Sequence, residues 1–87
     1  SAHRQREYDF ILFGLGRFGT AIGLRLSQAG YRVLGVDFNP TALREWRSLG
    51  LSGEYGDATD PEFISSLPLA KTHAVVSTVP FNLSALI

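Results

Sequence analysis

Three glycines at the spacing Gly14-x-Gly16-x-x-Gly19, followed by an acid at Asp37, are the residues of this 87-residue chain whose types and spacing could do chemistry. The first glycine permits a tight turn out of a strand, the second lets a pyrophosphate approach the backbone, and the third lets a helix pack closely on that strand. The N–H groups at the start of that helix attract phosphates. The spacing alone is common, but the apolar strand before it and the acid after it indicate a nucleotide-binding turn.

Asp37 follows Gly19 by 18 residues and ends the second apolar segment. A carboxylate there accepts hydrogen bonds from both ribose hydroxyls and repels a 2′-phosphate. It therefore favours NAD(H), or AMP, ADP or ATP with free ribose hydroxyls, over NADP(H); the alternative is a solvated acid at a strand end. Arg17, inside the glycine turn, is able to neutralise a phosphate or is an ordinary surface arginine.

Asp57 has two interpretations that the sequence leaves open: a polar contact beside the adenine or ribose, or a cap of the turn before Asp60. Ser77 and Thr78 end the fourth apolar segment, where their hydroxyls could face the second half of a dinucleotide. His73 opens that segment at the end away from the site, so we interpret it as structural. The sequence shows no Ser/His/Asp set and no metal-ligating cluster, and we expect neither a catalytic nor a metal site.

The elements that must position these residues alternate between strands and helices. Apolar, β-branched segments separated by helical ones predict parallel βα units, and right-handed crossovers give the strand order 3-2-1-4. The expected fold is an α/β, Rossmann-like sheet with helices on both faces that stops after its fourth strand. Strands are predicted at 8–13, 31–37, 52–55 and 73–78, and helices at 17–29, 40–49 and 61–67.

One face of the predicted helix 40–49 is apolar, with Ala42, Leu43, Trp46 and Leu49 directed toward the core. Trp46 could serve as a stacking platform for a base, but a tryptophan on such a face is expected in the core. Gly23, one turn beyond the third glycine of the turn, is expected to allow close packing of its helix on the sheet.

Composition narrows the class of protein. The chain is 45% hydrophobic and has zero formal net charge, which argues against a nucleic-acid surface. It has no cysteine, and its longest apolar runs are far shorter than the roughly 20 residues of a membrane helix. We expect residues 1–7 to be a leader or linker and 8–87 to be one domain that is incomplete at its C-terminus. The absence of any methionine indicates a segment of a longer protein.

The fourth strand is expected at the open side of the sheet, and its residues 74–76 include neither a proline nor a charge. Unprotected strand edges pair with neighbouring chains. We therefore expect this edge to be covered, either by a second copy of the chain or by further residues of the intact protein.

Four features together resemble the N-terminal domain of regulators of potassium conductance (RCK, KTN or TrkA-N domains) over residues 8–87. They are the turn Gly14-Leu-Gly-Arg-Phe-Gly19, Asp37, the segment Gly56-Asp-Ala-Thr-Asp-Pro61 and a strand ending in Ser-Thr. The resemblance implies a sensor rather than an enzyme, located at the cytoplasmic face of the cell membrane. Such domains bind NAD(H), ATP, ADP or AMP and pass the bound state to a potassium channel, transporter or cation/proton antiporter.

The resemblance also implies roles for single residues. Gly14, Gly16, Arg17 and Phe18 would hold the phosphates and Asp37 the ribose, while the adenine would be surrounded by Phe38, Asp57, Ala58 and Thr59. The family's domain usually continues through two more strands and a dimerising helix, which implies a homodimer or higher oligomer.

A second function stays open. The chain could be the N-terminal cofactor-binding segment of an NAD-dependent oxidoreductase, because saccharopine-dehydrogenase-like proteins carry a similar Gly-Asp-Ala-Thr segment, here 56–59. Acid/base residues of such an enzyme would lie beyond this segment.

Overall fold

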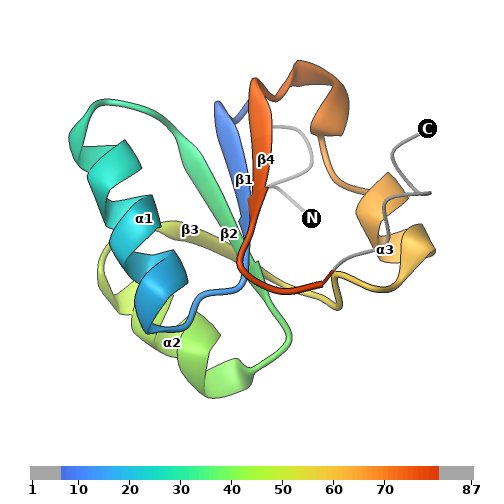
Figure 1. The fold of residues 1–87 in the computed structure, drawn as a ribbon, viewed down its shortest axis with the longest axis horizontal. Helices are drawn as coiled ribbons and strands as arrows, with labels where there is room; N and C mark the ends of the chain where they lie inside the picture. Colours follow the sequence, from blue (N-terminus) through green and yellow to red (C-terminus); the bar gives the residue numbers. More distant parts are fainter. Residues whose placement is uncertain (1–6, 81–87) are drawn as a thin grey trace.

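Four parallel strands form the single sheet of this computed structural model, which describes residues 7–80. The strand order is β3-β2-β1-β4, so the predicted order 3-2-1-4 is confirmed (Figure 1). In register, Leu12 pairs with Gly35 of β2 and with Val76 of β4. The strands are β1 (Phe10–Phe13), β2 (Val33–Asp37), β3 (Ser52–Tyr55) and β4 (Ala74–Ser77).

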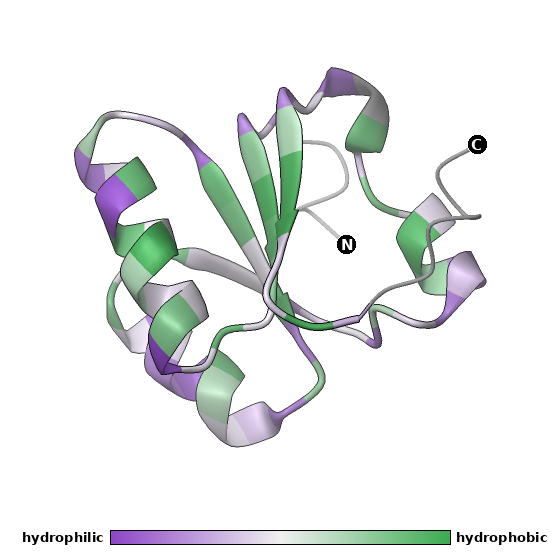
Figure 2. Ribbon diagram, viewed as in Figure 1, coloured by the Kyte–Doolittle hydropathy of each residue, from purple (hydrophilic) through white to green (hydrophobic). Residues whose placement is uncertain are grey.

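Helices cover both faces of the sheet, as the sequence predicted. In Figure 1, α1 and α2 lie on one side of the strands, and α3 lies on the other. The hydropathy colouring of Figure 2 shows mostly apolar strands between helices that are polar on the outside. The helices are α1 (Arg17–Gln28), α2 (Pro40–Ser48), α3 (Pro61–Ser65) and the short 3₁₀ helix η2 (Leu69–Lys71).

Local signals in the sequence set the helix boundaries. Gly30 follows α1 at φ +95° and Gly50 follows α2 at φ +83°, and this left-handed backbone favours glycine. Asn39 caps α2, because its side chain accepts hydrogen bonds from the N–H groups of residues 41 and 42. Asp60 caps α3 in the same way. The starts of α1, α2 and α3 are therefore where the sequence predicted them, whereas the 3₁₀ helix η2 was not predicted.

All three predicted helices and three of the strands are shorter than predicted, α1 and α2 each by one residue. α3 ends at Ser65 rather than at Leu67, because Ser66 and Leu67 hydrogen-bond three residues back, to Phe63 and Ile64, in a tightened last turn. Leu67 is nevertheless buried. The predicted strand 52–55 matches β3.

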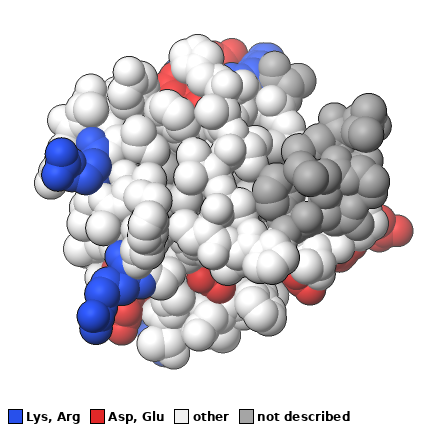
Figure 3. Space-filling view, viewed as in Figure 1, with Lys and Arg blue, Asp and Glu red and all other residues white. Residues whose placement is uncertain are grey.

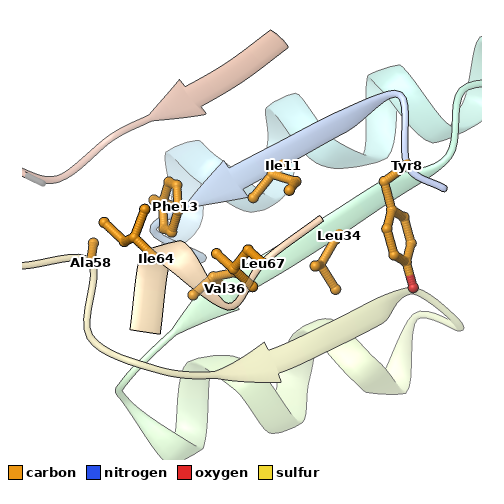
Figure 4. Packing of buried hydrophobic residues seen from close by; sticks show 8 residues of the cluster. All are labelled: Tyr8, Ile11, Phe13, Leu34, Val36, Ala58, Ile64 and Leu67. Carbon is orange, nitrogen blue, oxygen red and sulfur yellow. The ribbon is translucent and has the colours of Figure 1, made fainter. Parts of the chain in front are cut away.

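The apolar core has two parts, one on each face of the sheet. On the α3 face the side chains of strands β1 and β2 meet those of α3 and its flanking loops (Figure 4). On the other face the strands pack against α1 and α2. The first cluster is Tyr8, Ile11, Phe13, Leu34, Val36, Ala58, Ile64 and Leu67, and the second is Leu12, Leu15, Val33, Leu43 and Trp46.

Trp46 is fully buried, so its prediction as a core residue is confirmed. Its indole occupies a slot that exists because three neighbouring positions have no side chain. A Cβ added at any of them would lie 2.2–2.9 Å from the ring, closer than real Cβ atoms come. The indole Nε1 donates a hydrogen bond to the Ser52 carbonyl at 2.7 Å. The three positions are Gly23, Gly35 and Gly53.

Leu49 departs from the prediction of an apolar face that ends in the core. It is 48% exposed, whereas Leu43 and Trp46 of the same predicted face are buried. The reason is that α2 ends at Ser48 and Leu49 is its C-cap. Beyond the last turn, the helical spacing no longer directs a side chain toward the sheet.

The edge of β4 lies open within the part of the chain that the structure describes. β4 pairs with β1 and is last in the strand order. Its Ala74 is exposed and Val75 and Val76 are half-buried.

Among residues 7–80, no helix is long and apolar enough to cross a membrane. The face in Figure 3 is largely uncharged, with its Lys and Arg side chains mostly on the α1 and α2 side.

The glycine slot predicts the effect of Gly23→Ala. The new methyl group would lie 2.2 Å from Cη2 of Trp46, and the ring cannot retreat because Gly35 and Gly53 already contact its other atoms. Overpacking of this kind costs about 2 kcal/mol, more than the gain of about 1 kcal/mol in helix propensity. Urea unfolding followed by the fluorescence of Trp46 measures the loss. A variant as stable as the parent would mean that the slot is not rigid.

Candidate nucleotide-binding site

One cavity opens where the turns that follow all four strands come together. Its volume is about 280 Å³. Six of the eleven predicted site residues line it: Gly14, Asp37, Phe38, Asp57, Ala58 and Thr59. Val36, Gly56, Val79 and Pro80 complete the wall. The carboxyl ends of parallel strands are where ligands of such sheets bind.

The glycine turn has the geometry that its spacing predicted. Gly14 has φ +95°, so its backbone favours glycine. A Cβ on Gly19 would lie 1.8 Å from the carbonyl oxygen of Gly14. The first glycine therefore permits the turn, and the third allows α1 to approach it closely.

Gly16 and Arg17 lie on the other side of the turn, in a groove between α1 and α2 with a volume of about 670 Å³. Gly16 is the N-cap of α1, no side chain caps it, and the first turn has no acid. A Cβ on Gly16 would meet nothing within 4 Å. The protein itself therefore does not require glycine at this position, and the helix start is free to receive an anion.

Two phenylalanines flank the turn in different ways. Phe38 is 63% exposed but lines the cavity, whereas Phe18 is 64% exposed and lines neither the cavity nor the groove. Phe38 is thus placed for contact with a base. The predicted phosphate contact of Phe18 could come only from its backbone, at the start of α1.

The carboxylate of Asp37 joins the glycine turn to the end of β2. Its Oδ2 accepts a hydrogen bond from the Leu15 N–H at 2.8 Å, and its Oδ1 accepts one from the Asn39 N–H at 2.9 Å. A carboxylate has about four acceptor positions. Asp37 therefore keeps acceptor capacity toward the cavity that it lines.

Asp57 has the capping role, one of the two interpretations that the sequence left open. Its Oδ1 accepts hydrogen bonds from the N–H of Thr59 at 2.8 Å and from the hydroxyl of Thr59 at 2.7 Å. These bonds cap the turn before α3, and they hold the pKa of Asp57 below its ordinary value. The same residue lines the cavity, so a contact with the ligand stays a prediction beside the capping role.

Thr78 faces the glycine turn. Its Oγ1 donates toward the carbonyl oxygens of Phe13 at 3.2 Å and Gly14 at 3.3 Å. The hydroxyl of Ser77 instead hydrogen-bonds within its own segment, with the carbonyl of Val79.

The sequence did not single out three wall residues, Val36, Val79 and Pro80. Val79 and Pro80 follow β4, next to the point where the strand order reverses, and that position is the signal that could have found them.

His73 lies at the opposite end of β4, with its Nδ1 3.6 Å from Oδ1 of Asp9, as a structural residue would. Within residues 7–80, no group of three His, Cys, Asp or Glu side chains could hold a metal ion.

The sheet order and the glycine turn define the class of Rossmann-like, NAD(P)-binding domains. Within that class the chain belongs to the TrkA-N domain family, whose model matches residues 10–87. The predicted family and fold are confirmed.

Two curated relatives are potassium transport proteins by name. The chain is 30% identical over 77 residues to "Ktr system potassium uptake protein C" of Bacillus subtilis (strain 168), a match that covers 88% of this chain and 35% of that protein. It is 30% identical over 69 residues to "Glutathione-regulated potassium-efflux system protein KefC" of Cronobacter sakazakii, covering 79% of this chain and 11% of that protein. The chain thus spans about a third or less of these relatives.

A solved structure shares the fold. It is the crystal structure of the NAD(P)-binding domain of an exopolyphosphatase-related protein from Archaeoglobus fulgidus, with a TM-score of 0.81 and 31% identity. The match covers 92% of this chain and 62% of that one.

Asp57 should titrate below its ordinary pKa, and Thr59→Val should raise that pKa only part of the way. The substitution removes the hydroxyl bond, the second cause of the lowering, but leaves the backbone N–H bond, which is the first. Because the folded pKa is lowered, the stabilisation is present above the unfolded pKa and is lost as the pH falls through the folded one. NMR titration of the Asp57 carboxyl carbon measures its pKa in the parent and in the variant. An unchanged pKa in the variant would contradict the assigned hydroxyl bond.

Proposed function

We propose that this chain is the nucleotide-binding part of a regulator of potassium transport. It binds NAD(H) or an adenine nucleotide and passes the bound state to a membrane-embedded potassium channel, transporter or cation/proton antiporter at the cytoplasmic face. The observation that carries the proposal is the cavity at the sheet's switch point, bordered by Asp37 and by the glycine turn. The names of the potassium transport relatives support the regulatory role.

Each part of an adenosine nucleotide has a complementary surface in this proposal. The base enters the cavity between Phe38, Ala58 and Val79, where apolar walls favour a flat ring. The ribose hydroxyls donate to the remaining acceptor positions of Asp37. The phosphates cross the turn toward Gly16 and the uncapped N-terminus of α1, where the charge of Arg17 adds attraction.

The names of the potassium transport relatives favour the regulatory role over the oxidoreductase alternative. Within residues 7–80, the one histidine, His73, lies at the end of the sheet away from the cavity, so the described site offers no imidazole as an acid or base. An oxidoreductase would need those groups from outside this segment.

A cover for the open edge of β4 is part of the proposal. Because the edge of β4 is open and Ala74 is exposed, we expect other residues to cover this edge. A homodimer, a higher oligomer or further residues of the intact protein would supply them.

Adenosine nucleotides with free ribose hydroxyls should bind at least about ten times more tightly than NADP(H), a difference of about 1.4 kcal/mol. The reason is that the Asp37 carboxylate accepts from both hydroxyls and repels a 2′-phosphate. Calorimetric titration with NADH, AMP, ADP, ATP and NADPH measures the order. NADPH binding as tightly as NADH would refute the assignment of Asp37 to the ribose.

Gly16→Val should abolish nucleotide binding and leave the fold intact. The backbone of Gly16, at φ −70° and ψ −165°, suits a β-branched residue, and its Cβ would meet no protein atom within 4 Å. The added side chain would instead occupy the path of the phosphates. Calorimetry and thermal unfolding of the variant measure the two effects separately.

Ala29→Val is the matched control, since it adds similar bulk at the exposed C-cap of the same helix. We expect this variant to bind like the parent. Normal binding by Gly16→Val would show that the phosphates lie elsewhere.

A further inference from the structure

A single peptide group of the glycine turn is held from both sides by side chains of the neighbouring strands. The peptide joins Gly14 to Leu15. Its N–H donates to Oδ2 of Asp37, the last residue of β2, at 2.8 Å. Its carbonyl oxygen lies 3.3 Å from Oγ1 of Thr78, the residue after β4, whose one hydroxyl hydrogen is shared between this oxygen and the Phe13 carbonyl oxygen at 3.2 Å. Because β1 lies between β2 and β4, these two bonds fix the turn to the strands on either side of it.

Packing against the glycine turn also fixes the position of the Thr78 side chain. A Cβ on Gly14 would lie 2.1 Å from Oγ1 of Thr78, and a Cβ on Gly19 would lie 3.5 Å from the same atom. The hydroxyl therefore occupies space that the missing side chain of Gly14 leaves free, whereas a Cβ on Gly19 would be in ordinary contact with it. The backbone N–H of Thr78 also donates to the Phe13 carbonyl at 2.9 Å, which continues the β1–β4 ladder up to the turn.

We propose that Asp37 and Thr78 are positioning residues that hold the Gly14–Leu15 peptide, and with it the phosphate-binding turn, in its binding conformation. The inference rests on the proposed nucleotide-binding function. It gives Thr78 a role other than contact with the ligand, because its donor hydrogen is directed at the protein's own carbonyls. A turn held in one orientation binds without first being ordered, whereas the affinity of a loosened turn is the intrinsic affinity multiplied by the fraction of time that the turn spends in the competent state.

The hydrogen bonds that join the Gly14–Leu15 peptide to Asp37 and Thr78 form a clamp on this peptide. The Asp37 side of the clamp needs a carboxylate. Its two oxygens accept from the N–H groups of Leu15 and Asn39 at the same time. In Asp37→Asn one of these N–H groups would face an amide NH₂, which cannot accept a hydrogen bond. The clamp would therefore lose one of its bonds although the shape of the side chain is kept.

The deciding experiment compares Thr78→Val with Thr78→Ser. Valine keeps the shape of threonine and removes the hydroxyl, whereas serine keeps the hydroxyl and removes the methyl group. We expect Thr78→Val to speed hydrogen exchange of the Leu15 amide about fivefold in the absence of nucleotide, and to weaken NADH and AMP binding by a similar factor, since one neutral hydrogen bond is lost. Thr78→Ser should stay within about twofold of the parent in both measurements.

Thr72→Val is the matched control. It also removes one hydroxyl bond to a backbone carbonyl, that of Pro68 at 3.1 Å, and it lies before β4, away from the turn. A merely structural threonine would resemble this control and leave Leu15 exchange and nucleotide affinity unchanged. If Thr78→Val does not fold, Thr78→Ala takes its place.

The two readouts separate this inference from the proposed function. If the parent binds no nucleotide, the proposed function fails, while Leu15 exchange in the unliganded protein still tests the clamp. If the parent binds and Thr78→Val matches it in both exchange and affinity, the clamp is overturned. Faster exchange and weaker binding in Thr78→Val, reversed by serine, support it.

Discussion

The burial of one indole in a slot made by three glycines is the constraint on which the rest of this structure depends. Trp46 is completely buried, and α1, β2 and β3 each contribute one of the glycines that it contacts. A tryptophan buries 150–250 Å², roughly 4–6 kcal/mol at about 25 cal/mol per Å². That gain requires the sheet to approach α1 and α2 closely, and any Cβ in the slot prevents it. A large share of the apolar stabilisation of one sheet face is therefore concentrated in one side chain.

The site inherits its geometry from this face of the core. The side chain of Leu15 is buried in the same cluster as Trp46, and a Cβ on Gly35 would lie 2.8 Å from its Cδ2. The backbone N–H of Leu15 donates to Asp37. Leu15 thus anchors the glycine turn twice: its side chain packs in the core, and its backbone N–H is held by Asp37 at the site. Changes in core packing should reach the turn through this residue.

The sequence predicted the local turns and the strand order, and it missed individual contacts between residues on neighbouring strands. The glycine spacing predicted the turn between β1 and α1, and the segment Ser52–Tyr55 was placed correctly as β3. The bond between Asp37 and Leu15 joins residues 22 apart. It was not predicted, because the strand order places β2 beside β1 but does not specify which backbone N–H group a carboxylate at the strand end accepts from. Val79 and Pro80 were missed for the same reason: as wall residues they have no motif, only a position beside the turn.

The clamp changes how selectivity for the ribose should be understood in the proposed site. A solvated carboxylate at a strand end could rotate away from a 2′-phosphate and reduce the repulsion. Asp37 accepts from two backbone N–H groups on different segments, so rotation would break two charge-assisted hydrogen bonds, each worth about 1.5–3 kcal/mol. The carboxylate is therefore held where the repulsion acts. The proposed selectivity against NADP(H) and the proposed conformation of the phosphate turn then both depend on the hydrogen bond between Asp37 and the Leu15 N–H, so a substitution at Asp37 meant to alter one should also alter the other.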